Sequence, residues 1–163
     1  MRILGLDAGL LATGFGVVEA RHNCFEALSW GVWRSKKIDG LDGKLKFFYE
    51  QMRSILERFD PDAVALEGIY QFRNPRSAFM LAHVRGALIA CAAEFGVSVV
   101  ELAPSRIKRN LTGSGRAHKE QVAYAVGALL GIDDAIPADA SDALAVAISA
   151  ALELEAKAKV CGR

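Results

Sequence analysis

The chain has 163 residues, 52% of them hydrophobic and 24% charged, with a formal net charge of +1. This length fits one domain spanning residues 1–163, and the composition is that of a globular protein. Acidic residues interrupt every apolar stretch before it reaches the roughly 18 residues of a membrane span, so we expect no membrane association. Asp7 lies inside the apolar start, which argues against a cleaved signal peptide. The three cysteines are odd in number and widely spaced, which indicates no disulfide framework and favours the cytoplasm.

The near-neutral total conceals an uneven distribution of charge along the chain. Residues 71–119 carry eight basic and two acidic residues, a balance of +6, whereas the segments on either side are net acidic. A basic middle third could hold a polyanion. A solvated basic surface is the plainer alternative, and the charge pattern taken alone favours it.

In chain order, the first half predicts three strands and then a helix. Short strands are expected at residues 2–7, 13–18 and around 24–34, with short connections typical of an antiparallel meander. Apolar residues at three- and four-residue spacing over 45–59 predict an amphipathic helix, which Pro61 ends.

Strands and helices alternate in the second half. The pattern predicts strands at 63–67 and 97–100, and helices over 75–95, from Pro104, over 122–130 and from 137–139 onward. Helices that alternate with the later strands imply parallel pairing. The fold class is therefore α/β, with a mixed sheet of about five strands and helices on both faces.

Four acidic residues are notable for their positions. Asp7 ends the first strand and Glu67 ends the fourth. Asp139 and Asp142 lie three residues apart at the start of the last helix, so their side chains share one face. If the two strands are neighbours, all four carboxylates gather at one end of the sheet.

Clustered carboxylates raise one another's pKa unless a cation compensates. Their oxygens suit Mg²⁺ or Mn²⁺, and two such ions about 3.5–4 Å apart can activate a water and stabilise the leaving oxygen in phosphodiester cleavage. Plainer roles exist for each residue. Asp139 could cap the helix, Glu67 could pair with an arginine, and Asp7 could start a turn.

Two further segments are candidates for contact with nucleic acid. Residues 112–119 are glycine-rich and basic but lack the spacing of a P-loop, so they fit a phosphate-contacting loop or an ordinary surface loop equally well. Tyr70 and Phe72, flanked by Arg73 and Arg76, could stack on bases beside the phosphates, although aromatics that cover the core edge are the simpler explanation. The three histidines are scattered, which argues against a zinc site.

Taken together, these motifs resemble the RuvC family of Holliday junction resolvases in the ribonuclease H-like superfamily. The resembling segments, in order, are Ile3–Gly9 with Thr13–Val18, Ala65–Glu67, Gly113–Val122 and Asp139–Ala147. The resemblance covers nearly the whole chain and implies a ribonuclease H-like fold. It also implies a metal-dependent endonuclease that makes symmetric paired nicks in four-way junction DNA during recombination and repair.

The resemblance also assigns roles to individual residues. The metal-binding carboxylates would be Asp7, Glu67, Asp139 and Asp142. They would hold two Mg²⁺ ions per active site, for which Mn²⁺ would substitute. Lys108 and Lys119 would hold the scissile phosphate and offset its growing negative charge. The DNA-contacting side chains would be Tyr70, Arg73, Arg76, Lys108, Arg116 and Lys119. The family implies a homodimer joined through the helix over 75–95, and partnership with the junction-binding protein RuvA and the motor protein RuvB.

The chain departs from the family pattern at Ala8, where proline is usual, and at Gly68, where a larger polar residue is usual. Both departures concern loop geometry and sequence preference rather than metal ligands. Three other functions remain open at this point: trimming of ribosomal RNA precursors, DNA binding without catalysis, and an actin-like ATPase. The last is suggested by the turn from Asp7 to Gly14, but it would need two domains, for which 163 residues are too few.

Overall fold

Five strands and five helices are present in the described residues of the computed structural model, which are 1–22, 24–68 and 75–161. In chain order they are β1 (Arg2–Asp7), β2 (Ala12–Arg21), β3 (Cys24–Arg34), α1 (Leu41–Phe59), β4 (Ala63–Glu67), α2 (Pro75–Glu94), β5 (Ser98–Leu102), α3 (Pro104–Thr112), α4 (Lys119–Leu130) and α5 (Ala138–Cys161).

The strands form one mixed sheet in the order β3-β2-β1-β4-β5. The first three strands are an antiparallel meander, while β1 pairs with β4 and β4 with β5 in parallel. The α/β class and the mixed five-stranded sheet expected from the sequence are therefore confirmed. The parallel pairing of β1 with β4 makes the first and fourth strands neighbours, which was the condition for gathering the acids.

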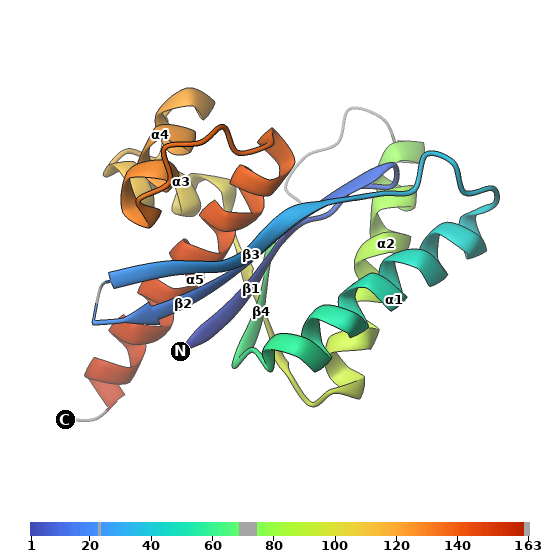
Figure 1. Cartoon of the computed structure of the whole chain (residues 1–163), viewed down its shortest axis with the longest axis horizontal. Coiled ribbons are helices and arrows are strands. Elements are labelled where there is room, and N and C mark those ends of the chain that lie inside the picture. Colours follow the sequence, from blue (N-terminus) through green and yellow to red (C-terminus); the bar gives the residue numbers. More distant parts are fainter. Residues whose placement is uncertain (23, 69–74, 162–163) are drawn as a thin grey trace.

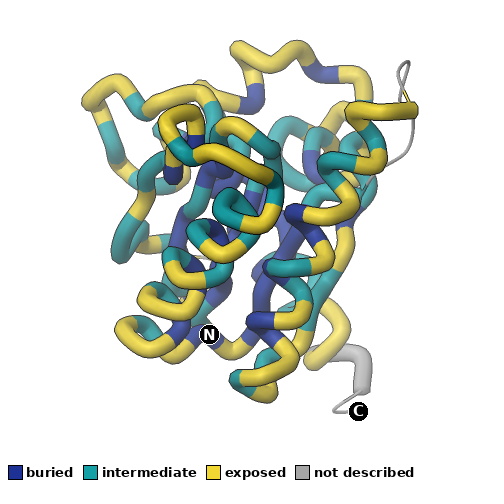
Figure 2. Tube along the Cα trace, turned by 90° about the vertical axis from the view of Figure 1, so that its right-hand side faces the viewer, coloured by how far each residue is buried: buried dark blue, intermediate teal, exposed yellow. Residues whose placement is uncertain are grey.

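Helices cover both faces of the sheet, with α3, α4 and α5 on one face and α1 and α2 on the other (Figure 1). Each face has its own apolar core. Residues such as Ile3 and Leu144 belong to the core beneath α5, and Leu4 and Phe48 belong to the core beneath α1. The buried residues follow the strands and the inner sides of the helices (Figure 2). Because successive side chains of β1 point to opposite faces, this short strand contributes to both cores.

Two elements are longer than the apolar patterns predicted. β2 continues to Arg21 because its antiparallel pairing with β3 runs through polar residues, with Glu19 opposite Glu26 and Arg21 opposite Cys24. α1 begins at Leu41 and ends where Asp60 adopts a left-handed conformation just before Pro61. In both cases backbone hydrogen bonding extends beyond the residues that are buried.

Among the described residues, α2 is the one helix long and apolar enough to cross a membrane by length and composition alone. The sequence analysis expected no such stretch. One such helix is weak support for a membrane span, because helices of soluble proteins can have the same composition. α2 packs against α1 and also contacts β5.

Candidate active site

Asp7 and Glu67 end two adjacent parallel strands at the same edge of the sheet. The register pairs Ile3 with Ala63 and continues to Leu6 with Leu66, so the two acids follow directly at the next position. Parallel strands place their carboxyl ends together, which is where α/β proteins commonly bind ligands. The sequence prediction that these two carboxylates lie side by side therefore agrees with the strand pairing.

The start of α5 lies directly against this edge because two glycines leave room for it. Gly14 is opposite Asp7 in the β1–β2 ladder, and a Cβ atom built on Gly14 would lie 1.9 Å from the carbonyl oxygen of Asp139. A Cβ atom on Gly5 would lie 2.1 Å from the carbonyl oxygen of Ala143. No larger residue fits between sheet and helix at these points, so the glycines bring the first two turns of α5 next to Asp7.

Asp139 and Asp142 both lie within these first turns. α5 begins at Ala138, which places Asp139 inside the first turn rather than at the preceding cap position. The Ser141 N–H donates to the main-chain carbonyl of Pro137 at 2.9 Å, so the first hydrogen bond of this turn starts from Pro137 and not from Asp139. Acidic residues are favoured at this end of a helix in any case, because the helix dipole is positive there.

The pKa values of Asp7 and Glu67 reflect their partial burial first and the neighbouring charges second. Burial raises the pKa of Asp7 to about 7, and the charges of Asp142, Glu67 and Asp139 add to the effect, while Lys119 opposes it. Burial and then Asp142 also raise the pKa of Glu67, against the charges of Lys108, Lys119 and Arg85. An increase from these causes is expected for carboxylates that share a site with no cation bound between them.

Lys119 is the first residue of α4 and binds one of the four acids. Its Nζ atom donates to Oδ2 of Asp142 at 2.6 Å, and this hydrogen bond raises the pKa of Lys119. The backbone N–H of His118 donates to Oε1 of Gln121 at 2.9 Å, which secures the helix start just before the lysine. The ammonium group is thus held next to the carboxylates while its side chain remains 62% exposed.

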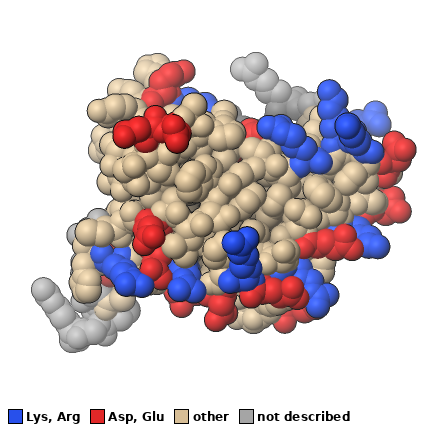
Figure 3. Space-filling view, viewed as in Figure 1, with Lys and Arg blue, Asp and Glu red and all other residues tan. Residues whose placement is uncertain are grey.

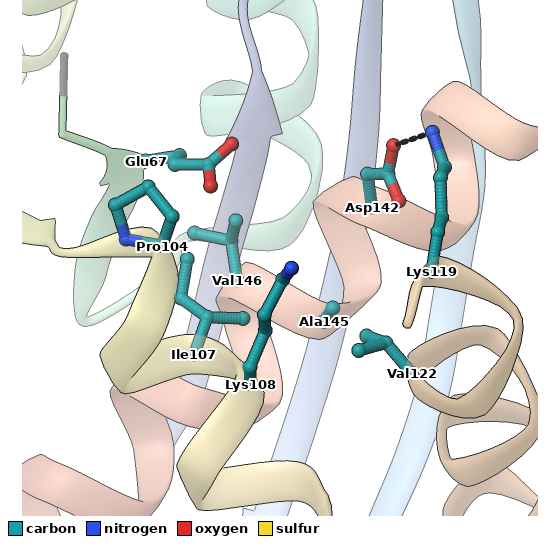
Figure 4. A pocket seen from close by; sticks show the side chains of 9 residues that line it. All are labelled: Glu67, Pro104, Ile107, Lys108, Lys119, Val122, Asp142, Ala145 and Val146. Atoms are coloured by element: carbon teal, nitrogen blue, oxygen red, sulfur yellow. Dashed lines mark hydrogen bonds and ion pairs between the residues drawn. The ribbon is translucent and has the colours of Figure 1, made fainter. Parts of the chain in front are cut away.

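Lys108 enters the same hollow from α3. The hollow has a volume of about 190 Å³ and is lined by Glu67, Pro104, Ile107, Lys108, Lys119, Val122, Asp142, Ala145 and Val146. Lys108 extends between Glu67 on one side and Asp142 on the other (Figure 4). The hollow therefore combines acids, which can bind cations, with two ammonium groups, which can bind a phosphate.

Hydrogen bonds between helices hold α3 in this place. Asn110 donates to Oγ of the buried Ser149 at 2.8 Å, and Arg106 donates to Oε1 of Glu153 at 2.7 Å. Both acceptors lie on α5, the helix that also carries Asp139 and Asp142. Side-chain hydrogen bonds thus join α3, which carries Lys108, to α5, which carries Asp139 and Asp142.

The turn after Asp7 is stabilised internally. The Thr13 hydroxyl is buried, donates to the Gly9 carbonyl at 3.0 Å and accepts from the Gly9 N–H at 3.3 Å. Ser35 donates to the Leu10 carbonyl at 2.6 Å. These bonds order the turn without the proline that Ala8 replaces. They also leave the Thr13 hydroxyl unavailable to a nucleotide phosphate, which argues against the actin-like ATPase.

The four carboxylates provide the right donor chemistry for a hard divalent cation, since all their ligand atoms are oxygens. In the described residues, no three Asp, Glu, His or Cys side chains are close enough to form a ready metal-binding group. Asp142 is instead turned to Lys119, as Figure 4 shows. The four residues fit a metal in their chemistry, and Asp7 and Glu67 also fit it in their raised pKa values. A bound metal would need Asp142 to exchange its lysine partner for the cation.

The remaining candidates for DNA contact are not among the described residues that line the hollow. Arg116 is exposed in the loop before α4, and Arg76 is exposed in the first turn of α2. Tyr70 and Arg73 lie outside the described residues, so their predicted roles remain predictions. Gly68 donates its N–H to the Leu102 carbonyl at 2.7 Å, which continues the pairing of β4 with β5 by one residue.

Two features were not predicted from the sequence. The first is Arg85 of α2, whose Nη1 atom donates to the Glu67 main-chain carbonyl at 2.6 Å. A charged residue at an inward position of an otherwise apolar helix was the available signal. The second is a group of basic residues over 34–46, from the end of β3 through the β3–α1 connection into the first turns of α1. On the face shown in Figure 3, basic side chains gather over this connection and acidic ones over the end where α4 and α5 meet.

Comparison with known proteins assigns the family. The family model described as crossover junction endodeoxyribonuclease RuvC matches residues 3–150. The chain belongs to the RuvC family. A curated family protein from Trichlorobacter lovleyi is 41% identical over 148 residues, which cover 91% of this chain and 83% of the relative. A family protein from Prosthecochloris aestuarii is 38% identical over 149 residues, covering 91% of this chain and 80% of the relative.

Solved structures agree with this assignment. A Thermus thermophilus RuvC structure is 30% identical and superposes with a TM-score of 0.89, covering 96% of this chain and 97% of the other. The same protein in complex with a Holliday junction substrate has a TM-score of 0.88 at 27% identity, covering 95% and 96% of the two chains. The yeast mitochondrial Holliday junction resolvase Ydc2, at 14% identity and a TM-score of 0.65, shares the fold. The ribonuclease H-like fold expected from the sequence is confirmed.

Proposed function

We propose that this protein is a Holliday junction resolvase that cuts four-way DNA junctions with symmetric paired nicks. The observation that carries the proposal is the gathering of Asp7, Glu67, Asp139 and Asp142 at one sheet edge beside Lys108 and Lys119. Family membership supports it, because a solved RuvC of the same fold is described in complex with a Holliday junction substrate. Recombination and repair of chromosomal DNA, in the cytoplasm, are the processes this activity would serve.

The metal ligands would be Asp7, Glu67, Asp139 and Asp142. Divalent metal ions held there, Mg²⁺ in our proposal with Mn²⁺ as a substitute, would supply an activated water and charge stabilisation for phosphodiester hydrolysis. Asp7 is the most central ligand in this proposal, because its pKa responds to all three of the other acids. Two ions per site are proposed, since four carboxylates exceed what one hard cation needs from the protein.

The two lysines would act on the phosphate. Lys108 extends into the hollow from α3 and Lys119 borders it from α4, so an anionic phosphate seated there would lie near both ammonium groups. Preorganised positive charge at the site where negative charge develops stabilises the transition state without reorganisation. When a metal binds Asp142, Lys119 would be released from its hydrogen bond to that acid and become available to the phosphate.

A homodimer joined through α2 is the proposed assembly. Phe79 on this helix is 70% exposed, and Ala82, Gly86 and Ala90 lie four residues apart on exposed positions. A Cβ atom built on Gly86 would meet nothing within 4 Å, so this face is open. An exposed aromatic beside small residues allows a second helix to approach closely and bury apolar area. Two copies would provide the two active sites that paired nicking needs.

We further propose that residues 1–163 form one domain, since both apolar cores are built on the same sheet. Cooperation with RuvA and RuvB is proposed from the family alone. Adding the two proteins to a junction-cleavage reaction would test it, with a changed cleavage rate or site as the expected result.

The proposed function is tested by incubating the purified protein with a synthetic four-way junction in Mg²⁺. We expect cuts at symmetric positions in two strands of like polarity, leaving 5′-phosphate and 3′-hydroxyl ends that ligase can join. Asp7→Asn should bind the junction in Ca²⁺ and leave it uncut in Mg²⁺. Asp39→Asn, which changes an exposed acid of the β3–α1 connection, should cut like the parent protein.

Other outcomes would assign other functions. Junctions that stay intact in Mg²⁺ and in Mn²⁺ while remaining bound would favour a DNA-binding module without catalysis. A structured RNA substrate in a parallel reaction tests the ribosomal RNA alternative, and faster cutting of RNA than of the junction would overturn the proposal.

A further inference from the structure

Arg85 is the only charged residue that is buried in the described part of the chain. It lies on α2 at 7% exposure, among apolar neighbours such as Val84 and Leu88. A charge is costly to bury unless it is paired and hydrogen-bonded, and an apolar residue would suit this helix position better for packing alone. The guanidinium group therefore calls for a role beyond filling space.

The group joins three elements at the edge of the active site. Its Nη1 atom donates to the main-chain carbonyl of Glu67 at 2.6 Å, and its Nη2 atom pairs with Oε1 of Glu101 at 2.8 Å. Glu67 is the last residue of β4, while Glu101 lies on β5. Arg85 thus ties the end of β4 to α2 on one side and to β5 on the other.

The hydrogen bond from Arg85 to the Glu67 carbonyl lies at the end of the β4–β5 pairing. The β4–β5 pairing ends with Glu67 opposite Leu102, followed by one hydrogen bond from the Gly68 N–H to the Leu102 carbonyl. Glu67 is thus the last paired residue of β4, and its main-chain carbonyl accepts its hydrogen bond from Arg85 of α2. A guanidinium group fixed by a second bond to Glu101 is a rigid donor, because its planar fork sets both directions at once.

We infer that Arg85 is a positioning residue for the nuclease, which fixes the backbone of Glu67 so that its carboxylate can join the metal-binding set. The inference rests on the proposed function, and Arg85 itself touches neither metal nor DNA. Because Arg85 projects inward from α2, whose outer face is the proposed subunit interface, the same residue links that interface to the active site.

The test compares Arg85→Met, Arg85→Lys and Glu101→Gln with the parent protein. Single-turnover cleavage of a saturating four-way junction is measured across a Mg²⁺ titration, and junction affinity is measured in Ca²⁺. We expect Arg85→Met to slow cleavage and raise the Mg²⁺ requirement by roughly 10- to 100-fold, the usual effect of losing a partner that orients a metal ligand. Junction affinity should stay within about twofold of the parent, since DNA contacts are untouched.

Two further variants should show smaller effects than Arg85→Met, and a third variant is the control. Arg85→Lys retains the charge but has a single nitrogen in place of the guanidinium fork, so it should recover part of the loss. Glu101→Gln weakens only the pairing between Arg85 and Glu101, so it should raise the Mg²⁺ requirement less than Arg85→Met does. Arg53→Met removes an exposed arginine that pairs with Glu57 on α1, and it should leave both quantities unchanged.

A second measurement keeps the inference separate from the proposed function. Mg²⁺ that binds the folded protein raises its Tm, and this needs no cleavage. We expect a smaller Mg²⁺-induced rise for Arg85→Met than for Arg53→Met even if no junction is ever cut. If Arg85→Met does not fold, Glu101→Gln carries the comparison, since its carboxylate is 53% exposed and its loss is tolerable. Folded variants with the parent's Mg²⁺ requirement and the parent's Tm rise would overturn the inference.

Discussion

Gly14 of β2 lies directly beneath Asp139 of α5, so close that a methyl group on Gly14 would come within 1.9 Å of the Asp139 carbonyl oxygen. The contact is backbone against backbone, which a rotamer change cannot relieve. Gly14 also faces Asp7 across the β1–β2 ladder. The distance between the two acids is therefore set by a residue that has no side chain.

Replacing Gly14 with alanine should separate the carboxylates. We expect Gly14→Ala to push the first turn of α5 away from β1, to lower the free energy of unfolding by about 1–3 kcal/mol as overpacking does, and to abolish most cleavage. Urea unfolding and junction cleavage measure the two effects. Gly43→Ala is the matched control, because its new methyl group would meet only the end of the Ile38 side chain. Full activity in a folded Gly14→Ala protein would contradict this account of the site.

The raised pKa of Asp7 predicts a dependence of stability on pH in metal-free protein. The carboxyl group has a pKa of about 7 in the folded state against an ordinary value of 3.8, so the folded state binds this proton more tightly. The stabilisation of the folded state by this proton is complete below pH 4 and disappears as pH rises to 7. We expect the Tm of Asp7→Asn, relative to the parent in EDTA, to increase between pH 4 and 7 and to level off above. A Tm difference that is constant with pH, like that expected for Asp39→Asn, would refute the explanation.

The same shift predicts competition between protons and metal. A cation must displace the Asp7 proton below pH 7, since a protonated carboxyl group is a poor ligand. The Mg²⁺ concentration for half-maximal cleavage should therefore be higher at pH 6 than at pH 8. A pH-independent Mg²⁺ requirement over this range would show that Asp7 does not control metal binding.

Lys119 is predicted to affect metal binding and catalysis in opposite directions. Its ammonium group donates a hydrogen bond to the Asp142 carboxylate at 2.6 Å, and its positive charge repels a cation at the site. Lys119→Met should therefore lower the Mg²⁺ concentration that stabilises the fold, while it slows cleavage by roughly 10²- to 10³-fold through loss of charge at the phosphate. Thermal shift and single-turnover kinetics test both effects. Lys46→Met, which removes a surface pair with Glu50 on α1, is the control. A parallel loss of metal binding and cleavage would contradict the prediction.

Phe79 is predicted to hold the dimer. Placing a charge on this 70% exposed ring position should desolvate a carboxylate at the interface, so Phe79→Asp should shift the protein from dimer to monomer. Sedimentation velocity measures the change, and paired nicking should give way to single nicks. Tyr124→Asp alters another exposed aromatic, 80% exposed on α4, and should leave the assembly unchanged. A dimer that survives Phe79→Asp would place the interface elsewhere.

Local pattern was sufficient for much of the protein. The alternation of apolar residues defines strands and helices because side-chain burial in each element follows its own period. Asp7 and Glu67 could be recognised as strand-terminal acids, and Asp139 and Asp142 as neighbours on one helix face, from spacing alone. The family resemblance rested on the same motifs, and the family model matching residues 3–150 confirms it.

The tertiary structure decided how these pieces meet, because the relevant contacts join residues far apart in the chain. No residue near Gly14 in the sequence indicates that α5, which begins more than a hundred residues later, packs against it. The role of Thr13 as the internal brace of a turn, and the bond from Arg85 to the Glu67 backbone, depend likewise on three-dimensional packing. The sequence thus determined which chemical groups the protein brings to its site. Their mutual positions, and hence the pKa of Asp7 and the pairing of Lys119 with Asp142, came from the pairing of β1 with β4 and from the packing of the helices on the sheet.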